Sequence, residues 1–126
     1  MGQISKKLRS AQNGGLMFWC PGCIEIHAIT TGPNGWTYNG NPEQPTFQPS
    51  VLVSNGHYAS TFKPGEACWC TFNAKRVAEG KEPSAFTCHR CHSFVIDGRI
   101  QFLGDSTHAL AGQTVDLPDL PEHMRD

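Results

Sequence analysis

The sequence has no long hydrophobic run and no export signal. None of its apolar stretches approaches the roughly 18 residues of a membrane-spanning helix. Residues 1–15 are polar and lack the apolar segment of a secretory signal peptide. These absences argue against membrane insertion and secretion, so they predict a cytoplasmic protein that has no membrane partner.

Basic charge is also scarce. Ten Lys and Arg residues stand against 11 Asp and Glu, which gives a formal net charge of −1. The aromatic residues are not interleaved with Lys or Arg, as they would be on a surface that stacks bases and neutralises phosphates. The sequence therefore predicts no nucleic-acid partner.

The composition favours a small protein that is mostly β (small α+β). Only 38% of the 126 residues are hydrophobic, and 13 Gly and nine Pro predict many short strands and turns. Asp97-Gly98, between two apolar stretches, predicts a hairpin over 93–103. We expect a compact antiparallel β-sheet domain with long loops over residues 16–120. A flexible N-terminal arm at 1–15 and a flexible tail at 121–126 would flank it.

Two stretches carry further predictions. Residues 46–53 have the pattern of a strand, and Pro49 predicts that this strand lies at an edge or contains a bulge. Residues 54–86 are long for a loop, which indicates either mobility or a role in covering a site. Within this loop, 68–72 has a β-like pattern and 74–79 could form a short helix that ends at Gly80.

The six cysteines include two C-x2-C pairs, Cys20–Cys23 and Cys88–Cys91. Each pair can present two thiolates through a tight turn, and two such turns complete the tetrahedral site that zinc prefers. In the cytoplasm, metal ligands or free thiols are expected more often than disulfides. We therefore predict a bound Zn²⁺.

The identity of the fourth metal ligand stays open on spacing alone. Cys20, Cys23 and Cys91 are the first three candidates, and the fourth position can be filled by one of three residues: Cys88, His92 or His27. His92 directly follows Cys91, and neighbours on a regular strand point to opposite faces. Cys68 and Cys70 are expected to be core or free thiols, with a second metal site as the alternative.

A zinc ion that activates water keeps one coordination position open and needs a base nearby. Asp105, Ser50 and His108 are the candidates for such a catalytic site, although none stands in a diagnostic spacing. Each residue also fits a structural role. Asp105 could cap a helix, Ser50 could be an edge-strand hydroxyl, and His108 could be a half-buried residue at a helix start.

An ordered set of motifs resembles a known family. The set comprises Phe18-Trp19-Cys20-Pro21-Gly22-Cys23, Trp36, Pro45-Thr46-Phe47-Gln48-Pro49-Ser50-Val51, Cys91-His92-Ser93-Phe94-Val95, and the stretch from Gly104 to Val115. It is similar to a family of small phage and prophage proteins that carry a domain of unknown function and are often mis-titled "ammonia monooxygenase". The phage branch of that family usually has Cys where this chain has Ser106.

The resemblance implies a small zinc-binding β domain in a bacterial host, with Cys20, Cys23, Cys91 and His92 as the metal ligands. Some relatives are regarded as zinc-dependent peptidases that act on a bacterial ubiquitin-like protein. The leading hypothesis is therefore a zinc-dependent, peptidase-like hydrolase that binds a peptide or a ubiquitin-like C-terminus as an added strand. The alternative is a non-enzymatic phage interaction module with a structural zinc.

Overall fold

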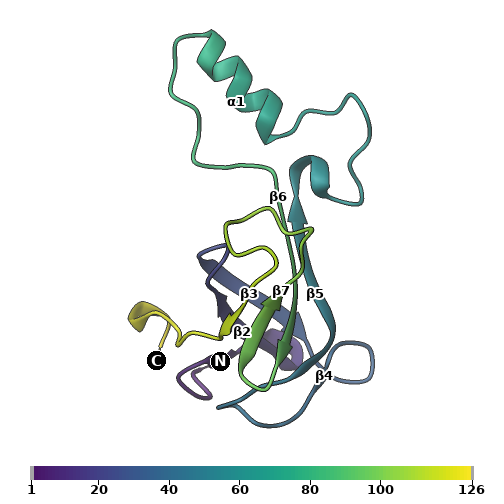
Figure 1. Ribbon diagram of the computed structural model, residues 1–126, viewed down its shortest axis with the longest axis vertical. Coiled ribbons are helices and arrows are strands. Elements are labelled where there is room, and N and C mark those ends of the chain that lie inside the picture. The colour runs from purple at the N-terminus through teal and green to yellow at the C-terminus, as the bar shows by residue number, and fades with distance from the viewer. Residues whose placement is uncertain (1, 126) are drawn as a thin grey trace.

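The fold consists of two antiparallel β-sheets that pack face to face, with one helix projecting away from them (Figure 1). The computed structural model describes residues 2–125. The first sheet has the order β1 (Leu8–Ser10), β2 (Gly15–Cys20), β3 (Glu25–Thr30). The second has the order β4 (Thr37–Tyr38), β5 (Phe47–Asn55), β6 (His89–Ile96), β7 (Arg99–Phe102), β8 (Thr114–Asp116). The predicted fold class, mostly β with antiparallel strands, is confirmed.

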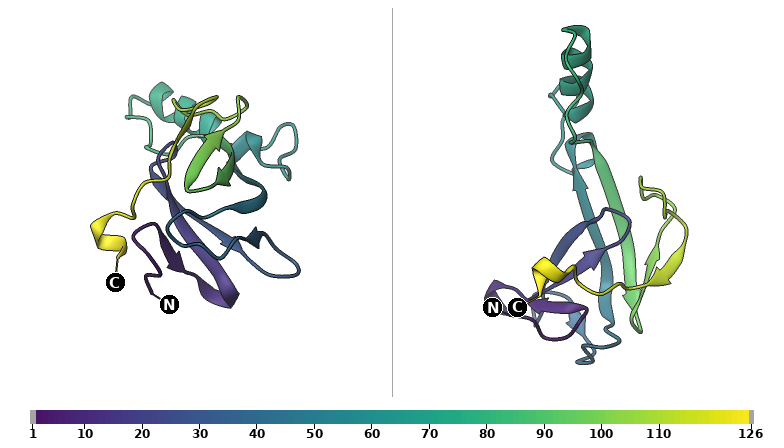
Figure 2. Two further views of the ribbon diagram at one scale, coloured as in Figure 1. Left: turned by 60° about the horizontal axis from the view of Figure 1, so that its bottom comes forward. Right: turned by 90° about the vertical axis from the view of Figure 1, so that its left-hand side faces the viewer.

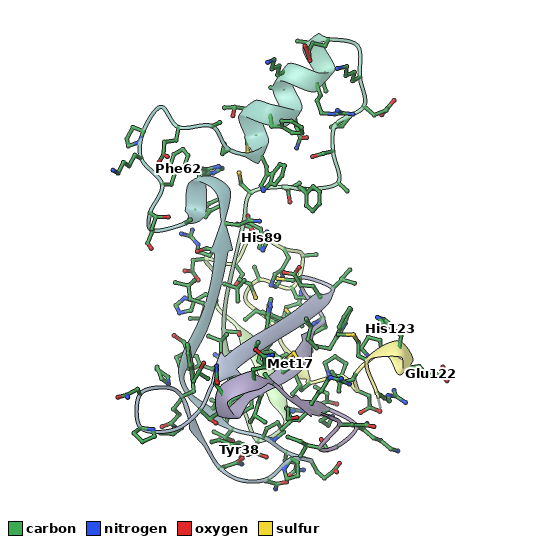
Figure 3. All side chains as sticks on the ribbon, turned by 180° about the vertical axis from the view of Figure 1, so that it is seen from behind. Met17, Tyr38, Phe62, His89, Glu122 and His123 are labelled. Carbon is green, nitrogen blue, oxygen red and sulfur yellow. The ribbon has the colours of Figure 1, made fainter. Side chains whose placement is uncertain are left out.

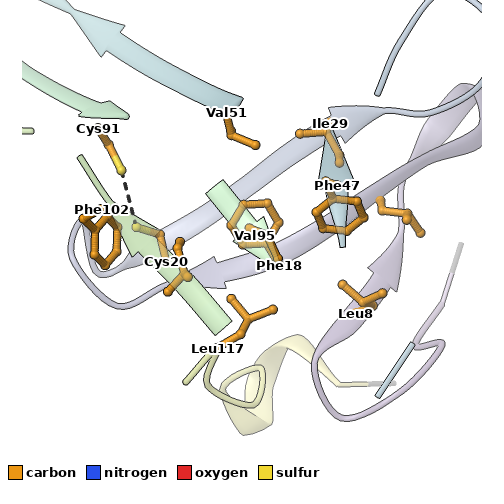
Figure 4. Close-up of a cluster of buried hydrophobic side chains, with 12 residues drawn as sticks. Leu8, Phe18, Cys20, Ile29, Phe47, Val51, Cys91, Val95, Phe102 and Leu117 are labelled. Atoms are coloured by element: carbon orange, nitrogen blue, oxygen red, sulfur yellow. Dashed lines mark hydrogen bonds between the residues drawn. The ribbon is translucent and has the colours of Figure 1, made fainter. Parts of the chain in front are cut away.

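The core lies between the inner faces of the two sheets. Alternate residues of β2 and β6 are buried, as expected for strands with one face inside. Phe18 of β2 stacks on Phe47 of β5 with ring centroids 6.0 Å apart, which joins the sheets at the centre of the cluster in Figure 4. Each such fully buried side chain stabilises the fold by about 1.5–3 kcal/mol.

The N-terminal residues differ from the predicted flexible arm over 1–15. Residues 8–10 form β1, which pairs with β2 in the register Leu8 to Phe18. The side chain of Leu8 is fully buried in the core, and this burial holds the segment in place. The remaining domain boundaries, including the flexible tail, stay predictions.

The predicted hairpin is present. β6 and β7 pair with Val95 opposite Ile100, and Asp97-Gly98 forms the connection. Both turn residues have positive φ, 50° at Asp97 and 77° at Gly98, which is the conformation that a two-residue turn of matching twist requires. The sequence signal was sufficient here because the turn chemistry is local.

β5 combines an irregularity with a partly open edge. Its pairing with β6 shifts register between Phe47 and Val51, so Pro49 lies in a bulge, one of the two positions that the sequence predicted. β4 covers only Phe47 and Gln48 of β5 on the other side. Among the described residues, Val51–Asn55 therefore have no strand partner on that side.

Residues 56–88, which we call the projection, leave the sandwich at the end of β5 and return at β6 (Figures 1 and 2). The projection contains a short 3-10 turn, Gly56–Tyr58, and α1 (Trp69–Ala78). The β-like pattern expected at 68–72 is wrong, because Cys68 caps α1 and the following residues form its first turn. Within residues 2–125, no helix has the length and apolar character of a membrane span.

Candidate active site and metal centre

One strand, β6, carries two different kinds of polar site on its two faces. Cys91, Ser93 and Val95 are buried against the first sheet, whereas the residues between them face outward. Successive side chains of a strand point to opposite faces. Cys91 therefore points into the sandwich, and His92 points away from it.

On the outer face, His92 connects a serine and an aspartate. Its Nε2 lies 2.9 Å from Ser50 Oγ, and its Nδ1 lies 3.2 and 3.3 Å from the two carboxylate oxygens of Asp105. The His92 side chain is 25% exposed and that of Asp105 45% exposed, so the group is open to solvent. We call these three residues the triad. A hydroxyl, an imidazole and a carboxylate in this hydrogen-bonded order can generate a nucleophilic serine.

The β5–β6 register brings Ser50 close to His92. His92 is opposite Leu52 in the β5–β6 register, and Ser50 precedes Leu52 by two residues on the same outer face. The Ser50 carbonyl accepts a 3.2 Å hydrogen bond from the indole Nε1 of Trp36. This contact fixes the serine backbone beside the histidine.

Asp105 is brought to His92 by a loop that runs along β6. The backbone N–H of Leu103 donates to the His92 carbonyl at 2.9 Å, and that of Thr107 donates to the Arg90 carbonyl at 2.9 Å. Arg90 Nε donates to the Asp105 carbonyl at 2.9 Å and lies 3.7 Å from its carboxylate. The loop therefore has several attachments to β6 on either side of Asp105.

Ser106 contributes the most local of these attachments. Its Oγ accepts a 3.0 Å hydrogen bond from the His92 backbone N–H and donates a 3.1 Å bond to the His92 carbonyl. Ser106 is buried, so both bonds are shielded from water. A single hydroxyl thus fixes the backbone that carries the imidazole.

On the inner face, three cysteines and a histidine converge to form the group that we call the core cluster. Its members are Cys20, Cys23, Cys91 and His108, and one ligand atom of each lies within 4.8 Å of all the others. Cys20 Sγ and Cys91 Sγ are 3.8 Å apart across the two sheets, as Figure 4 shows. Ligand atoms around a tetrahedral zinc stand roughly 3.5–3.8 Å apart. The core cluster could therefore hold a metal ion.

The sequence around the first C-x2-C pair fits this purpose. The Cys23 backbone N–H donates to Cys20 Sγ at 3.3 Å, which is a common outer-shell bond to a metal-binding sulfur. A Cβ at Gly22 would collide with the imidazole of His108, so only glycine lets this ring approach. His108 Nε2 is buried and has no hydrogen-bond partner among the described residues, which leaves it free to be a ligand.

The remaining contacts of His108 orient its ring. The imidazole meets the Phe102 ring edge-on at 4.4 Å, and the Leu110 backbone N–H lies 3.2 Å from Nδ1. The Leu110 N–H donates to Nδ1, so ligation through Nε2, which places the ring proton on Nδ1, would require this hydrogen bond to be given up. With His108 as a ligand, the core cluster offers four protein ligands to one metal ion.

The thiols of the core cluster share protons. Hydrogen bonds from Cys23 and Cys91 hold the pKa of Cys20 far below its ordinary value. The same bond to Cys20 raises the pKa of Cys23 to about 12, and the bonds to Cys20 and Cys23 raise the pKa of Cys91. A divalent cation would replace these protons and let all three cysteines bind as thiolates.

The positions of His92 and His108 in the structure are the reverse of those expected from the sequence. Spacing leaves the fourth metal ligand open, the resemblance implies His92 beside Cys20, Cys23 and Cys91, and the catalytic candidates are Ser50, His108 and Asp105. In the structure, His108 lies with the cysteines and His92 with Ser50 and Asp105. The reason is the regular geometry of β6, which turns His92 away from its neighbour Cys91.

The other open candidates lie elsewhere. His27 is 4% exposed and buried against Phe18, with Nε2 lacking a hydrogen-bond partner among the described residues. It forms a separate group of possible ligands with Cys23 and Glu25. Cys88 lies in the projection, in a further group with His57, Cys68 and Cys70.

The structure therefore defines a class of protein, a small two-sheet β protein with a Ser–His–Asp group outside one sheet and a Cys3His group inside it. The chain belongs to the family described as "Bacterial ubiquitination-like system serine protease (BubE)", whose model matches residues 2–103. The predicted link to bacterial ubiquitin-like pathways is confirmed at the level of the family. The match includes Ser50 and His92 and ends before Asp105 and His108. Neither a curated protein nor a solved structure matches the chain significantly.

Proposed function

We propose that the protein is a serine protease in which Ser50 is the nucleophile, His92 the general base and Asp105 the residue that orients the imidazole. The observation that carries this proposal is the 2.9 Å contact between Ser50 Oγ and His92 Nε2, with Asp105 at Nδ1 of the same ring. The family description, a serine protease, supports it independently. Hydrolysis is thereby assigned to a serine and not to a zinc-bound water.

The chemistry follows from these contacts. Ser50 Oγ attacks the carbonyl carbon of the scissile bond while His92 Nε2 accepts the hydroxyl proton. The carbon–nitrogen bond then breaks, and His92 returns the proton to the leaving amine. Water attacks the resulting ester with His92 again as base, which releases the carboxylic acid and restores Ser50. Asp105 stabilises the imidazolium that forms in each half of the reaction.

We assign the core cluster a structural Zn²⁺ bound by Cys20, Cys23, Cys91 and His108. Three thiolates and one imidazole are a ligand set typical of closed structural zinc sites. When bound, the ion would join β2 and β6 at the end of the hydrophobic core. Because His92 points to the opposite face of β6, this metal takes no part in the proposed reaction.

The substrate is proposed to bind as an added strand along β5. Val51–Asn55 lack a strand partner on one side among the described residues, which leaves backbone donors and acceptors beside Ser50. Leu52, 56% exposed and opposite His92, offers an apolar contact to a substrate side chain. A cavity of about 750 Å³ lies instead at the base of the projection, and none of the triad residues lines it. An extended peptide fits the triad better than a small molecule does.

The proposed substrate class is the C-terminal segment of a bacterial ubiquitin-like protein, or a peptide bond that follows it. The family's place in a ubiquitination-like system supports this choice, because such C-termini are extended chains. A phage or prophage origin and a location in the bacterial cytoplasm belong to the same proposal.

Cleavage of a bacterial ubiquitin-like protein with a C-terminal extension tests the proposal. We expect the intact protein to release the extension, detected by mass spectrometry, and the Ser50→Ala variant to lose activity by about 10⁴-fold or more. Ser60→Ala, which removes an exposed serine of the projection, is the matched control and should cleave normally. Full activity of Ser50→Ala would overturn the proposal.

A further inference from the structure

A second group of metal-ligand side chains lies in the projection, outside the site described above. We call His57, Cys68, Cys70 and Cys88 the projection cluster. One ligand atom of each lies within 4.8 Å of all the others, and Cys70 Sγ is 3.8 Å from His57 Nδ1. This separation matches the roughly 3.5–3.8 Å between ligand atoms around tetrahedral zinc.

The cluster brings together three segments of the projection. His57 comes from the short 3-10 turn after β5, Cys68 and Cys70 from the start of α1, and Cys88 from the residue before β6. A Cβ at Gly56 would collide with Cys88 Sγ, so the chain at the first segment is built to let this sulfur approach. Gly22 plays the same part for His108 in the core cluster.

The helix start favours a negative sulfur at Cys68. The Cys68 side chain caps α1 by accepting the backbone N–H of Thr71, and Cys70 lies within the first turn. The free N–H groups and the positive end of the helix dipole stabilise thiolates there. Two thiolates at one helix start, with a third from Cys88, are compensated best by a divalent cation.

No buried core stabilises the projection. None of the residues from 56 to 88 is buried, and α1 has no buried side chain. A ten-residue helix is marginal in water without tertiary packing. The contacts of the projection include Trp69 stacked on Phe86 at 4.9 Å and hydrogen bonds between Asn73 and Ser84, and none of these side chains is fully buried. Small folded units of this kind are commonly held by a structural metal.

We propose that the projection cluster is a second structural zinc site, with His57, Cys68, Cys70 and Cys88 as its four ligands, and that this ion folds the projection. It is separate from the core cluster, since the two share no ligand. The sandwich folds around its own hydrophobic core and needs only the first ion. The projection is then a zinc-folded insertion between β5 and β6, and His89, labelled with Phe62 in Figure 3, marks its base.

The full chain is dialysed against excess Zn²⁺, and the number of zinc ions bound per chain is then measured by elemental mass spectrometry. We expect two zinc ions per chain in the unaltered protein and one in the double variant Cys68→Ser, Cys70→Ser. Val77→Ser, an exposed position in the same helix, is the matched control and should retain two. Whether the sandwich of the double variant has folded is measured separately, by hydrogen exchange of β6 and β7.

Hydrogen exchange supplies a second readout. The α1 amides of the unaltered protein should be protected with zinc, and in the double variant they should exchange as fast as an unfolded chain while β6 and β7 stay protected. Cobalt(II) should give a tetrahedral, thiolate-rich spectrum at two equivalents per chain, and at one in the double variant. The proposal is overturned if the unaltered protein binds one zinc in excess metal. Two zinc ions in the double variant, or α1 protection that does not depend on zinc, would overturn it equally.

Discussion

Cys91 and His92 are neighbours in sequence, but their side chains lie on opposite faces of β6. Cys91 points inward to Cys20, with the two sulfurs 3.8 Å apart, and His92 points outward to Ser50, with Nε2 and Oγ 2.9 Å apart. The pleat of one strand therefore separates the core cluster, the proposed metal site, from the triad. Adjacent substitutions should consequently have unlike effects.

The first prediction contrasts these two neighbours. His92→Ala should abolish protease activity, retain the zinc of the core cluster and change the free energy of unfolding by no more than about 1 kcal/mol, since the side chain is partly exposed. Cys91→Ser should lose that zinc and unfold at a much lower urea concentration, because it removes a buried metal ligand. Metal analysis and urea denaturation measure both effects.

His123→Ala is the control for this pair, as His123 is exposed in the C-terminal 3-10 turn. It should leave activity and zinc content unaltered. Loss of the core zinc in His92→Ala would contradict the assignment of the two faces.

The second prediction concerns Asp105. Asp105→Asn removes the carboxylate that holds Nδ1 of His92, so the imidazole loses its orientation and its stabilising charge. We expect kcat to fall by about 10²–10⁴-fold with KM nearly unchanged. Steady-state kinetics measure this, with Asp119→Asn, an exposed aspartate near the C-terminus, as the matched control. A normal kcat in Asp105→Asn would show that Asp105 does not assist His92 in the reaction.

The third prediction concerns Ser106, a positioning residue. Ser106→Ala leaves the His92 backbone N–H without its acceptor, at a cost of about 1–3 kcal/mol in the free energy of unfolding. The imidazole should then be held less firmly, which lowers kcat more than it alters KM. Ser106→Thr, which keeps the hydroxyl, should recover more of kcat than Ser106→Ala. Equal kcat for the two variants would show that the hydroxyl does not position His92.

The hairpin and the first C-x2-C pair could be predicted from sequence because their signals are local. Asp97-Gly98 determines its own turn, and the Cys20–Cys23 turn gathers two sulfurs within four residues. The residues that join these two sulfurs in the core cluster could not be predicted in this way. Which histidine completes the core cluster depends on two features. One is the side of β6 to which each residue points, and the other is the loop after β7, which brings His108 to the cysteines.

The triad has no sequence signal of its own. Ser50, His92 and Asp105 come from a bulged strand, a central strand and a loop, and only the β5–β6 register and the bonds of the loop to β6 bring them together. The alternation of side chains along a strand predicts that Cys91 and His92 point to opposite faces, as they do in the structure. The N-terminal strand was missed for a similar reason, because the burial of Leu8 depends on packing against distant residues.

The fourth prediction separates a structural zinc from a catalytic one. Removing zinc with a chelator should lower the melting temperature of the sandwich, and activity should fall only in proportion to the unfolded fraction. Circular dichroism and peptide cleavage, recorded on the same samples, measure the two quantities. Complete loss of activity in a chelated sample that is still fully folded would show that the metal takes part in hydrolysis.

Labelling with a serine-reactive fluorophosphonate, followed by mass spectrometry of the digested chain, tests the central claim most directly. The probe forms a covalent bond only with a serine whose proton is removed by a neighbouring base. We predict one adduct per chain, on Ser50, that is absent from His92→Ala and undiminished in chelated protein that remains folded. Labelling of Ser50 that persists unchanged in His92→Ala, or no labelling of an active preparation, would contradict the account.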